Sequence, residues 1–144
     1  MLTNAKNCDA AMRRITEIIV HCTATPEGRA VSVDEVDRWH RQRGFAMIGY
    51  HFLVLLDGTV GQGRPLWQAG AHCLEHNAHS IGICYVGGLD CHMRPKDTRT
   101  DAQKAALKAL VGRLRQQFPG LHVYGHRDFA AKACPCFDAH GEYD

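Results

Sequence analysis

The sequence lacks a long hydrophobic run, a block of charge and any segment typical of export. No apolar stretch reaches the roughly 20 residues that a membrane helix needs, and the start, M-L-T-N-A-K-N-C-D-A, has no signal-peptide core. We therefore expect a protein made in the cytoplasm and not inserted into a membrane. With 17 basic and 15 acidic residues the formal charge is only +2, and no basic block with interleaved aromatic residues occurs. We expect no nucleic-acid partner.

Several catalytic motifs are also missing. The chain has no G-x-S-x-G elbow, no Walker loop, no dinucleotide fingerprint and no H-E-x-x-H helix, which sets aside the corresponding hydrolases and nucleotide enzymes. Seven cysteines are many for 144 residues, but their number is odd and their spacing irregular. This argues against a disulfide framework of the secreted type and favours a reducing compartment.

The order of hydrophobic patterns predicts the fold class. Residues 1–14 are polar and aperiodic and predict a mobile tail, whereas 15–144 are enough for one domain with one core. Strand-like runs end near His21, near Gly87 and near His126. Two helical patterns alternate with these runs. We therefore predict an α/β fold with a central mixed sheet flanked by helices.

Turn and capping signals place the boundaries of these elements. Ser32 with Glu35, and Thr100 with Gln103, are typical capping boxes at helix starts; the first helix is expected to end at Gly44 and the second to run through Phe118. Residues 48–64 contain Asp-Gly between two strand-like runs, which predicts a hairpin. The segment 65–79 is irregular and holds three histidines.

The stretch 121–138 contains residue types that bind zinc. A strand-like run ends at His126, and the loop that follows it contains Lys132 and Cys134. Imidazole and thiolate are preferred ligands of Zn²⁺, and three protein ligands leave a fourth position for water or substrate. The third ligand candidate is His21, at the end of a β-branched run that reads as a buried strand. Lys132 would place a cation beside the metal, where it can stabilise negative charge on a substrate oxygen.

Other interpretations of these residues remain open. Most of the ten histidines are expected to be ordinary surface or core residues, and C-P-C at 134–136 could equally be a redox pair. His122 shares a strand face with His126, but about 13 Å of strand separates them, so they cannot share one ion without a bend. His72, His76 and His79 could form a second metal site only if loop geometry gave them a common focus.

Seven segments together resemble a known family. They are V-H-C-T-A-T at 20–25, W-H-R-Q-R-G at 39–44, I-G-Y-H-F at 48–52, D-G-T-V at 57–60, H-N-A-H-S-I-G-I with V-G-G at 76–88, G-H-R-D at 125–128 and K-A-C-P-C-F-D at 132–138. In this order they are similar to the zinc-dependent N-acetylmuramoyl-L-alanine amidases, the group that includes small bacteriophage lysozymes and animal peptidoglycan recognition proteins. The resemblance covers most of residues 15–138.

The resemblance implies a role for each of several residues. It implies one Zn²⁺ per chain in a groove at the end of the sheet, bound by His21, His126 and Cys134. It implies Tyr50 and Lys132 as catalytic side chains. His72, Asn77 and Trp67 are the substrate-binding residues that it suggests. The chain departs from the family at Cys136, where a second thiol lies within reach of the metal and could compete with Cys134.

The resemblance also implies the activity. It is hydrolysis of the amide bond between N-acetylmuramic acid and L-alanine, with peptidoglycan or muropeptides as substrate. Two alternatives come from other classes: a module that binds peptidoglycan without cutting it, and a dithiol redox protein that uses Cys134 and Cys136. Because no export signal is expected, the protein would reach the wall after release or export, or would act on wall fragments inside the cell.

Overall fold

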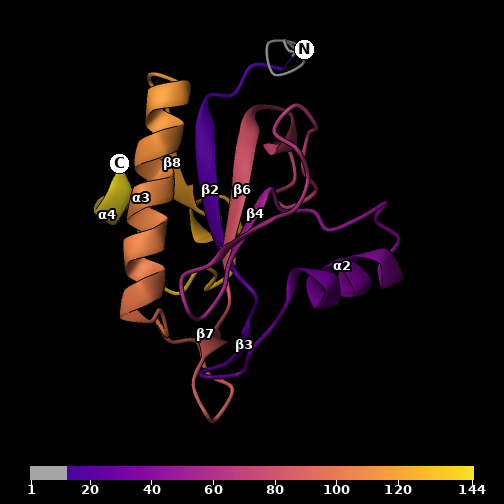
Figure 1. Ribbon diagram of the computed structural model, residues 1–144, viewed down its shortest axis with the longest axis vertical. Helices are drawn as coiled ribbons and strands as arrows, with labels where there is room; N and C mark the ends of the chain where they lie inside the picture. Colours follow the sequence, from indigo (N-terminus) through magenta and orange to yellow (C-terminus); the bar gives the residue numbers. More distant parts are fainter. Residues whose placement is uncertain (1–12) are drawn as a thin grey trace.

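The centre of the molecule is a mixed five-stranded sheet. The computed structural model describes residues 13–144. The strands are β2 (Glu17–Cys22), β4 (Phe52–Val54), β5 (Val60–Gln62), β6 (Ser80–Tyr85) and β8 (His122–Gly125), in the order β5-β4-β6-β2-β8 (Figure 1). β2 runs parallel to both β6 and β8, β6 runs parallel to β4, and β4 and β5 are antiparallel. The predicted α/β class with a mixed sheet is confirmed.

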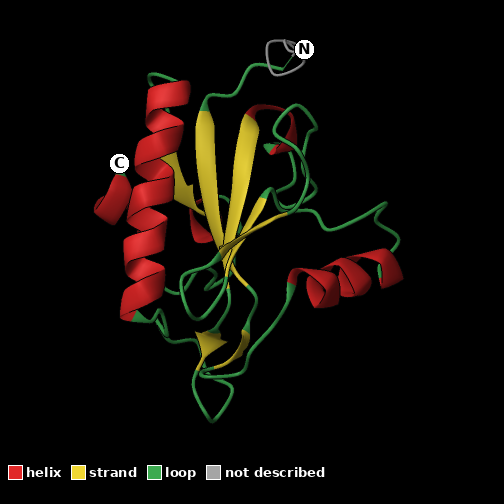
Figure 2. Cartoon of the chain, in the orientation of Figure 1, coloured by secondary structure: helices red, strands yellow, loops and turns green. Residues whose placement is uncertain are grey.

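Helices lie on either side of this sheet (Figures 1 and 2). They are α2 (Val33–Gln42), α3 (Asp101–Gln117) and the short α4 (Ala139–Tyr143), with 3-10 turns η1 (Asn77–His79) and η2 (His126–Asp128). Strands β3 (Thr25–Pro26) and β7 (Gly88–Leu89) form a separate parallel pair. The sequence patterns did not predict α4, which begins where the Asp138 side chain accepts a hydrogen bond from the Gly141 N–H at 3.0 Å.

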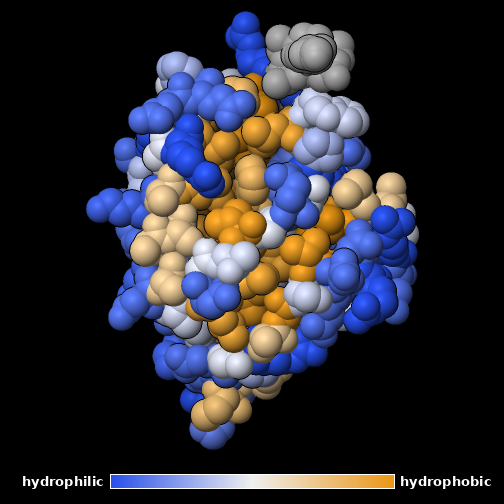
Figure 3. Space-filling model, viewed as in Figure 1, coloured by the Kyte–Doolittle hydropathy of each residue, from blue (hydrophilic) through white to orange (hydrophobic). Residues whose placement is uncertain are grey.

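The central strand β2 divides its side chains between two environments. Ile18 and Val20 are fully buried in the core that contains Leu107 and Leu110 of α3. Because side chains alternate along a strand, His21 points to the opposite face from these residues. A second core, which includes Val36 of α2, lies apart from the first. Figure 3 shows hydrophobic residues gathered in the middle of the viewed face, with hydrophilic residues around them.

The predicted caps and hairpin are present, with one difference. Thr100 and Gln103 form a complete capping box at α3. At α2 the Ser32 side chain accepts from the Glu35 N–H at 3.1 Å, but the Glu35 carboxylate binds Arg29 at 2.7 Å. The ion pair therefore replaces the second half of that box. The hairpin turns at Asp57-Gly58, where the Gly58 N–H donates to the Leu55 carbonyl.

The predicted tail falls almost entirely on residues 1–12, which lie outside the described residues. Arg13 is described, and its guanidinium donates to the carbonyls of Leu66 at 2.7 Å and Ser80 at 2.9 Å. These bonds attach Arg13 to the folded chain. Within residues 13–144, no helix has the length and apolar character needed to span a bilayer.

Candidate functional site

The strand register brings His21 and His126 together. β2 and β8 are parallel neighbours, with Val20 opposite Gly125, so the residue that follows each lies at the same edge of the sheet. The two imidazole ring centroids are 4.6 Å apart. Cys134 Sγ lies 4.0 Å from His21 Nδ1, and one donor atom from each of the three residues lies within 4.8 Å of the other two. The structure thus places the three predicted zinc ligands in one cluster.

Three hydrogen bonds from other parts of the chain hold the loop that carries Cys134. The Arg127 N–H donates to the Cys134 carbonyl at 2.8 Å, and the Tyr85 hydroxyl donates to the Pro135 carbonyl at 2.6 Å. The Cys22 N–H donates to Cys134 Sγ at 3.2 Å. This hydrogen bond orients the sulfur atom of Cys134 toward the cluster, as a partner of a metal ligand does.

His72 lies behind His21 and completes a chain of hydrogen bonds. His21 Nε2 is 2.8 Å from His72 Nδ1, and His72 Nε2 is 3.2 Å from the Ser80 hydroxyl. When His21 Nε2 donates to His72, Nδ1 of His21 keeps its lone pair on the side facing Cys134. The His72 ring packs on Gly82, where a Cβ atom would lie 2.7 Å from it. Glycine at this position therefore makes room for the histidine.

The surroundings keep the histidines neutral. Burial lowers the pKa of His21 well below its usual value, and burial lowers that of His72 to about 3. Burial and then the charge of Lys132 lower the pKa of His126. Neutral imidazole is the form with a free lone pair for a metal ion. Lys132 itself is exposed at the edge of the same pocket.

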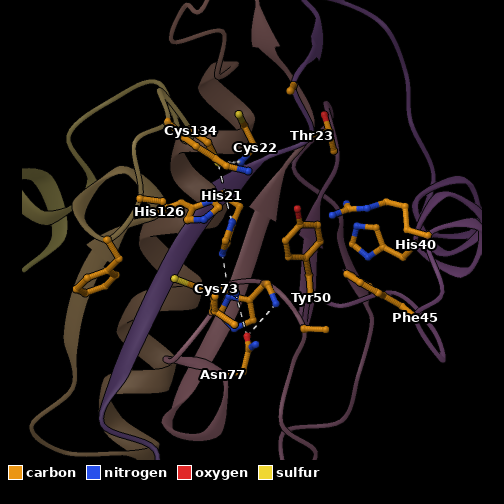
Figure 4. Close-up of a pocket in the computed structure, with 18 of the residues that line it drawn as sticks. His21, Cys22, Thr23, His40, Phe45, Tyr50, Cys73, Asn77, His126 and Cys134 are labelled. Atoms are coloured by element: carbon orange, nitrogen blue, oxygen red, sulfur yellow. Dashed lines mark hydrogen bonds between the residues drawn. The ribbon is translucent and has the colours of Figure 1, made fainter.

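Tyr50 stands beside the cluster, between His21 and His40 (Figure 4). Its ring centroid is 5.1 Å from that of His21 and 5.2 Å from that of His40. Burial raises the pKa of Tyr50 well above its usual value. The phenol therefore stays protonated at neutral pH and can donate a hydrogen bond into the pocket.

These residues line one pocket of about 840 Å³. Asn77 also lines it, and its side-chain oxygen accepts from the N–H groups of His72 and Cys73 at 2.8 and 2.9 Å. Trp67 is 54% exposed and is not among the lining residues, so its contact with substrate stays a prediction. Further lining residues that the sequence did not single out are Thr23, Arg43, Phe45, Leu74, Glu75 and Phe129. Arg43 and Phe45 flank Gly44 just beyond the end of α2, and no local sequence pattern marks them as pocket residues.

The Cys136 thiol is not part of the cluster formed by His21, His126 and Cys134. Its Sγ is 3.2 Å from the Gly88 carbonyl and 4.0 Å from Cys22 Sγ. Among the described residues, the cluster of metal-ligand atoms at this site comprises His21, His126 and Cys134. The geometry therefore favours Cys134 over Cys136 as the ligand, and it separates the two thiols of the C-P-C segment.

The residues present fit a zinc ion. Two imidazoles and one thiolate form a mixed nitrogen and sulfur set of the kind zinc prefers, and three protein ligands leave a position open toward the pocket. Both His21 and Cys134 have hydrogen-bond partners that orient their donor atoms. The site can hold a metal ion beside an exposed lysine and a protonated tyrosine.

Comparisons with known proteins agree with this geometry. The chain is 42% identical over 123 residues to an endolysin of Klebsiella phage KP32, covering 85% of this chain and 82% of that protein. The fold matches N-acetylmuramoyl-L-alanine amidase LysC from Clostridium intestinale with a TM-score of 0.76 and 28% identity, over 90% of this chain and 82% of that one. Drosophila PGRP-LB shares the fold with a TM-score of 0.76 at 23% identity, over 90% of this chain and 79% of that one.

The match to a family extends over nearly the whole chain. Residues 11–137 correspond to the family described as N-acetylmuramoyl-L-alanine amidase. This span includes both histidines and the cysteine of the cluster, Tyr50 and Lys132. The chain therefore belongs to the N-acetylmuramoyl-L-alanine amidase family.

Proposed function

We propose that the protein is a zinc-dependent hydrolase that cleaves the amide bond between N-acetylmuramic acid and L-alanine of peptidoglycan. The observation that carries the proposal is the convergence of His21, His126 and Cys134 at one end of an open pocket. Amidase chemistry follows from the family, whereas the bound zinc and the residue roles belong to the proposal. Release to the wall, export, or action on wall fragments inside the cell remain alternative settings.

The three ligands would hold one Zn²⁺. Such an ion lowers the pKa of a bound water to about 7 and polarises a carbonyl oxygen. The protein's own contribution is orientation: His72 fixes the His21 ring, and the Cys22 N–H fixes Cys134 Sγ. Neither contact requires a bound substrate.

Lys132 and Tyr50 are the proposed catalytic side chains. Amide hydrolysis builds negative charge on the carbonyl oxygen, and preorganised donors that meet this charge lower the barrier. Lys132 offers a cation at the pocket edge, and Tyr50 offers a protonated hydroxyl beside His21. Tyr50 would also relay a proton toward the leaving amine.

The wall of the pocket would hold the glycopeptide. His72 and Asn77 are the proposed substrate contacts there. The hydrogen bonds from the N–H groups of His72 and Cys73 to the Asn77 side chain also stabilise the conformation of the segment 72–77. Trp67 remains a predicted contact outside this pocket. Exposed Leu74 and Phe129 add apolar surface to the wall.

Digestion of purified peptidoglycan tests the proposal. Mass spectrometry of the products should show free L-alanine amino ends and intact muramic acid. A chelator should abolish cleavage and added Zn²⁺ should restore it. A binding-only module would be retained on the wall without new amino ends. A redox protein would instead catalyse thiol–disulfide exchange without bound zinc.

Lys132→Ala separates catalysis from metal binding. We expect it to lower kcat by about 10²–10³, the typical cost of losing one oxyanion donor, while the zinc content stays equal to that of the parent protein. Lys108→Ala, on the exposed side of α3, is the matched control and should leave kcat unchanged. An unchanged rate for Lys132→Ala with retained zinc would remove Lys132 from the mechanism.

A further inference from the structure

A second group of metal-ligand side chains lies at the other end of β2. Glu17 Oε1 is 2.6 Å from His76 Nδ1 and 3.2 Å from His79 Nε2. One donor atom from each of these residues lies within 4.8 Å of the other two. The geometry points to a second binding site for a zinc-type divalent ion, formed by Glu17, His76 and His79.

The ligand set suits such an ion. Two histidines and one glutamate form a known three-ligand zinc set, and imidazole also suits neighbouring transition metals. The three histidines of the segment 65–79 do not share one site. His76 and His79 converge on Glu17 of β2, whereas His72 contacts His21. The sequence pattern of this segment did not predict Glu17 as a ligand of the second site.

The backbone holds all three residues before any ion arrives. Glu17 is the first residue of β2 and lies between Ser80 of β6 and His122 of β8. The turn η1, which contains His79, leads directly into β6, and the Thr16 N–H donates to the His79 carbonyl at 2.9 Å. A preformed arrangement lowers the cost of ordering the ligands when the ion binds.

Among the described residues 13–144, no lysine or arginine forms an ion pair with the Glu17 carboxylate. The side chains in contact with its Oε1 are the imidazoles of His76 and His79. Side-chain exposure is 12% for Glu17, 24% for His76 and 39% for His79. The carboxylate is thus held in place, while the histidines leave a path for an ion and for water to complete its coordination.

The second site is separate from the first but borders the same pocket. Glu17 and His21 lie on one face of β2, four residues and about 13 Å apart. The His76 ring stacks on Phe129, with centroids 3.8 Å apart, and Phe129 lines the pocket. An ion at Glu17, His76 and His79 would therefore brace the pocket wall without sharing a ligand with the catalytic cluster.

Zinc binding in a background without the first site tests this inference, which does not depend on the proposed activity. Cys134→Ser with His126→Gln removes two of the first site's three ligands. Equilibrium dialysis of this metal-free double variant against Zn²⁺, followed by elemental analysis, should find about one ion per chain. Zn²⁺ should also raise its thermal midpoint, because an ion that binds only the folded state stabilises it.

Adding His76→Gln and His79→Gln should abolish both the bound ion and the thermal shift. Adding His92→Gln instead, at an exposed histidine in another loop, is the matched control and should preserve both. Glu17→Gln in the same background gives a second way to remove the site if the histidine variants unfold, as judged by circular dichroism. The inference is overturned if the background variant binds no zinc, or if removal of these ligands leaves zinc binding unchanged.

Discussion

His72 shows how one side chain can serve the site without touching the metal. The family resemblance suggested a substrate contact, and the structure places the residue on the pocket wall. It also lies 2.8 Å from His21 Nε2, on the side of the ring away from Cys134. A partner of this kind fixes the ring and its tautomer, and so raises the affinity of the ligand for a metal.

We therefore expect His72→Gln to weaken zinc binding by about 10–100-fold, the usual effect of removing a partner of a metal ligand. Competition with a chromophoric chelator measures this affinity directly. His92→Gln should have no effect. If zinc affinity were unchanged while KM for peptidoglycan rose, His72 would act on the substrate alone.

The two thiols of the C-P-C segment should differ in their importance for zinc binding. Cys134→Ser should lose activity together with the zinc of the cluster formed by His21, His126 and Cys134, because it removes one of these ligands. Cys136→Ser should retain both, because its Sγ contacts the Gly88 carbonyl instead. Elemental analysis of zinc, compared with the parent protein, checks both variants, and a loss of one zinc per chain in Cys136→Ser would show that Cys136 is a ligand.

Among the helices, α3 depends on one buried polar side chain. Gln103 is fully buried, and its amide group donates to the carbonyls of Val54 and Val86 at 3.2 and 3.0 Å and accepts from the Thr100 N–H. It therefore caps its own helix and also ties α3 to β4 and to the end of β6. An unsatisfied buried polar group costs about 1–3 kcal/mol, so these partners make Gln103 important for stability.

Gln103→Ala should lower the free energy of unfolding by about 2–4 kcal/mol, because it leaves the buried Val86 carbonyl without its donor and removes half of the helix cap. Urea unfolding of the metal-free protein measures the change. Gln116→Ala, on the exposed side of the same helix, should change it by less than about 0.5 kcal/mol. Equal effects of the two substitutions would contradict this account.

Distant parts of the molecule are joined at Arg99, which is 3% exposed. Its guanidinium binds Asp97 and Glu142 at 2.9 Å and lies 3.4 Å above the Phe137 ring. These contacts join the segment before α3 to the loop of Cys134 and to α4. The hydrogen bond from Arg99 holds the pKa of Glu142 below its usual value.

The lowered pKa of Glu142 predicts a dependence of stability on pH. A carboxyl group with a depressed folded-state pKa adds stability above its unfolded pKa of about 4.3, and loses it as pH falls through the folded value. Glu142→Gln should therefore be less stable than the parent at pH 7, and this difference should shrink below about pH 4. Thermal unfolding with a chelator present measures it without a contribution from metal release. A difference that stays constant with pH would contradict the prediction.

The sequence by itself determined the elements and the chemical types of the site. The spacing of hydrophobic residues, the Asp57-Gly58 turn and the Thr100 cap are local signals, each formed by residues a few positions apart. The strands, the hairpin and the helix starts were therefore predictable. The run into His21 likewise indicated a buried strand, and the histidine and cysteine types indicated zinc. α4 was missed because its five residues are too short for a periodic pattern.

Only the tertiary structure decided which of these residues meet. His21 and Cys134 are 113 positions apart, His21 and His72 are 51 apart, and His76 and Glu17 are 59 apart. Such contacts depend on the order and register of strands, which a local pattern does not encode. The pairing of β2 with both β6 and β8 places one metal-ligand cluster at each end of the central strand. It also places His72 behind a ligand and sends Cys136 away from the cluster.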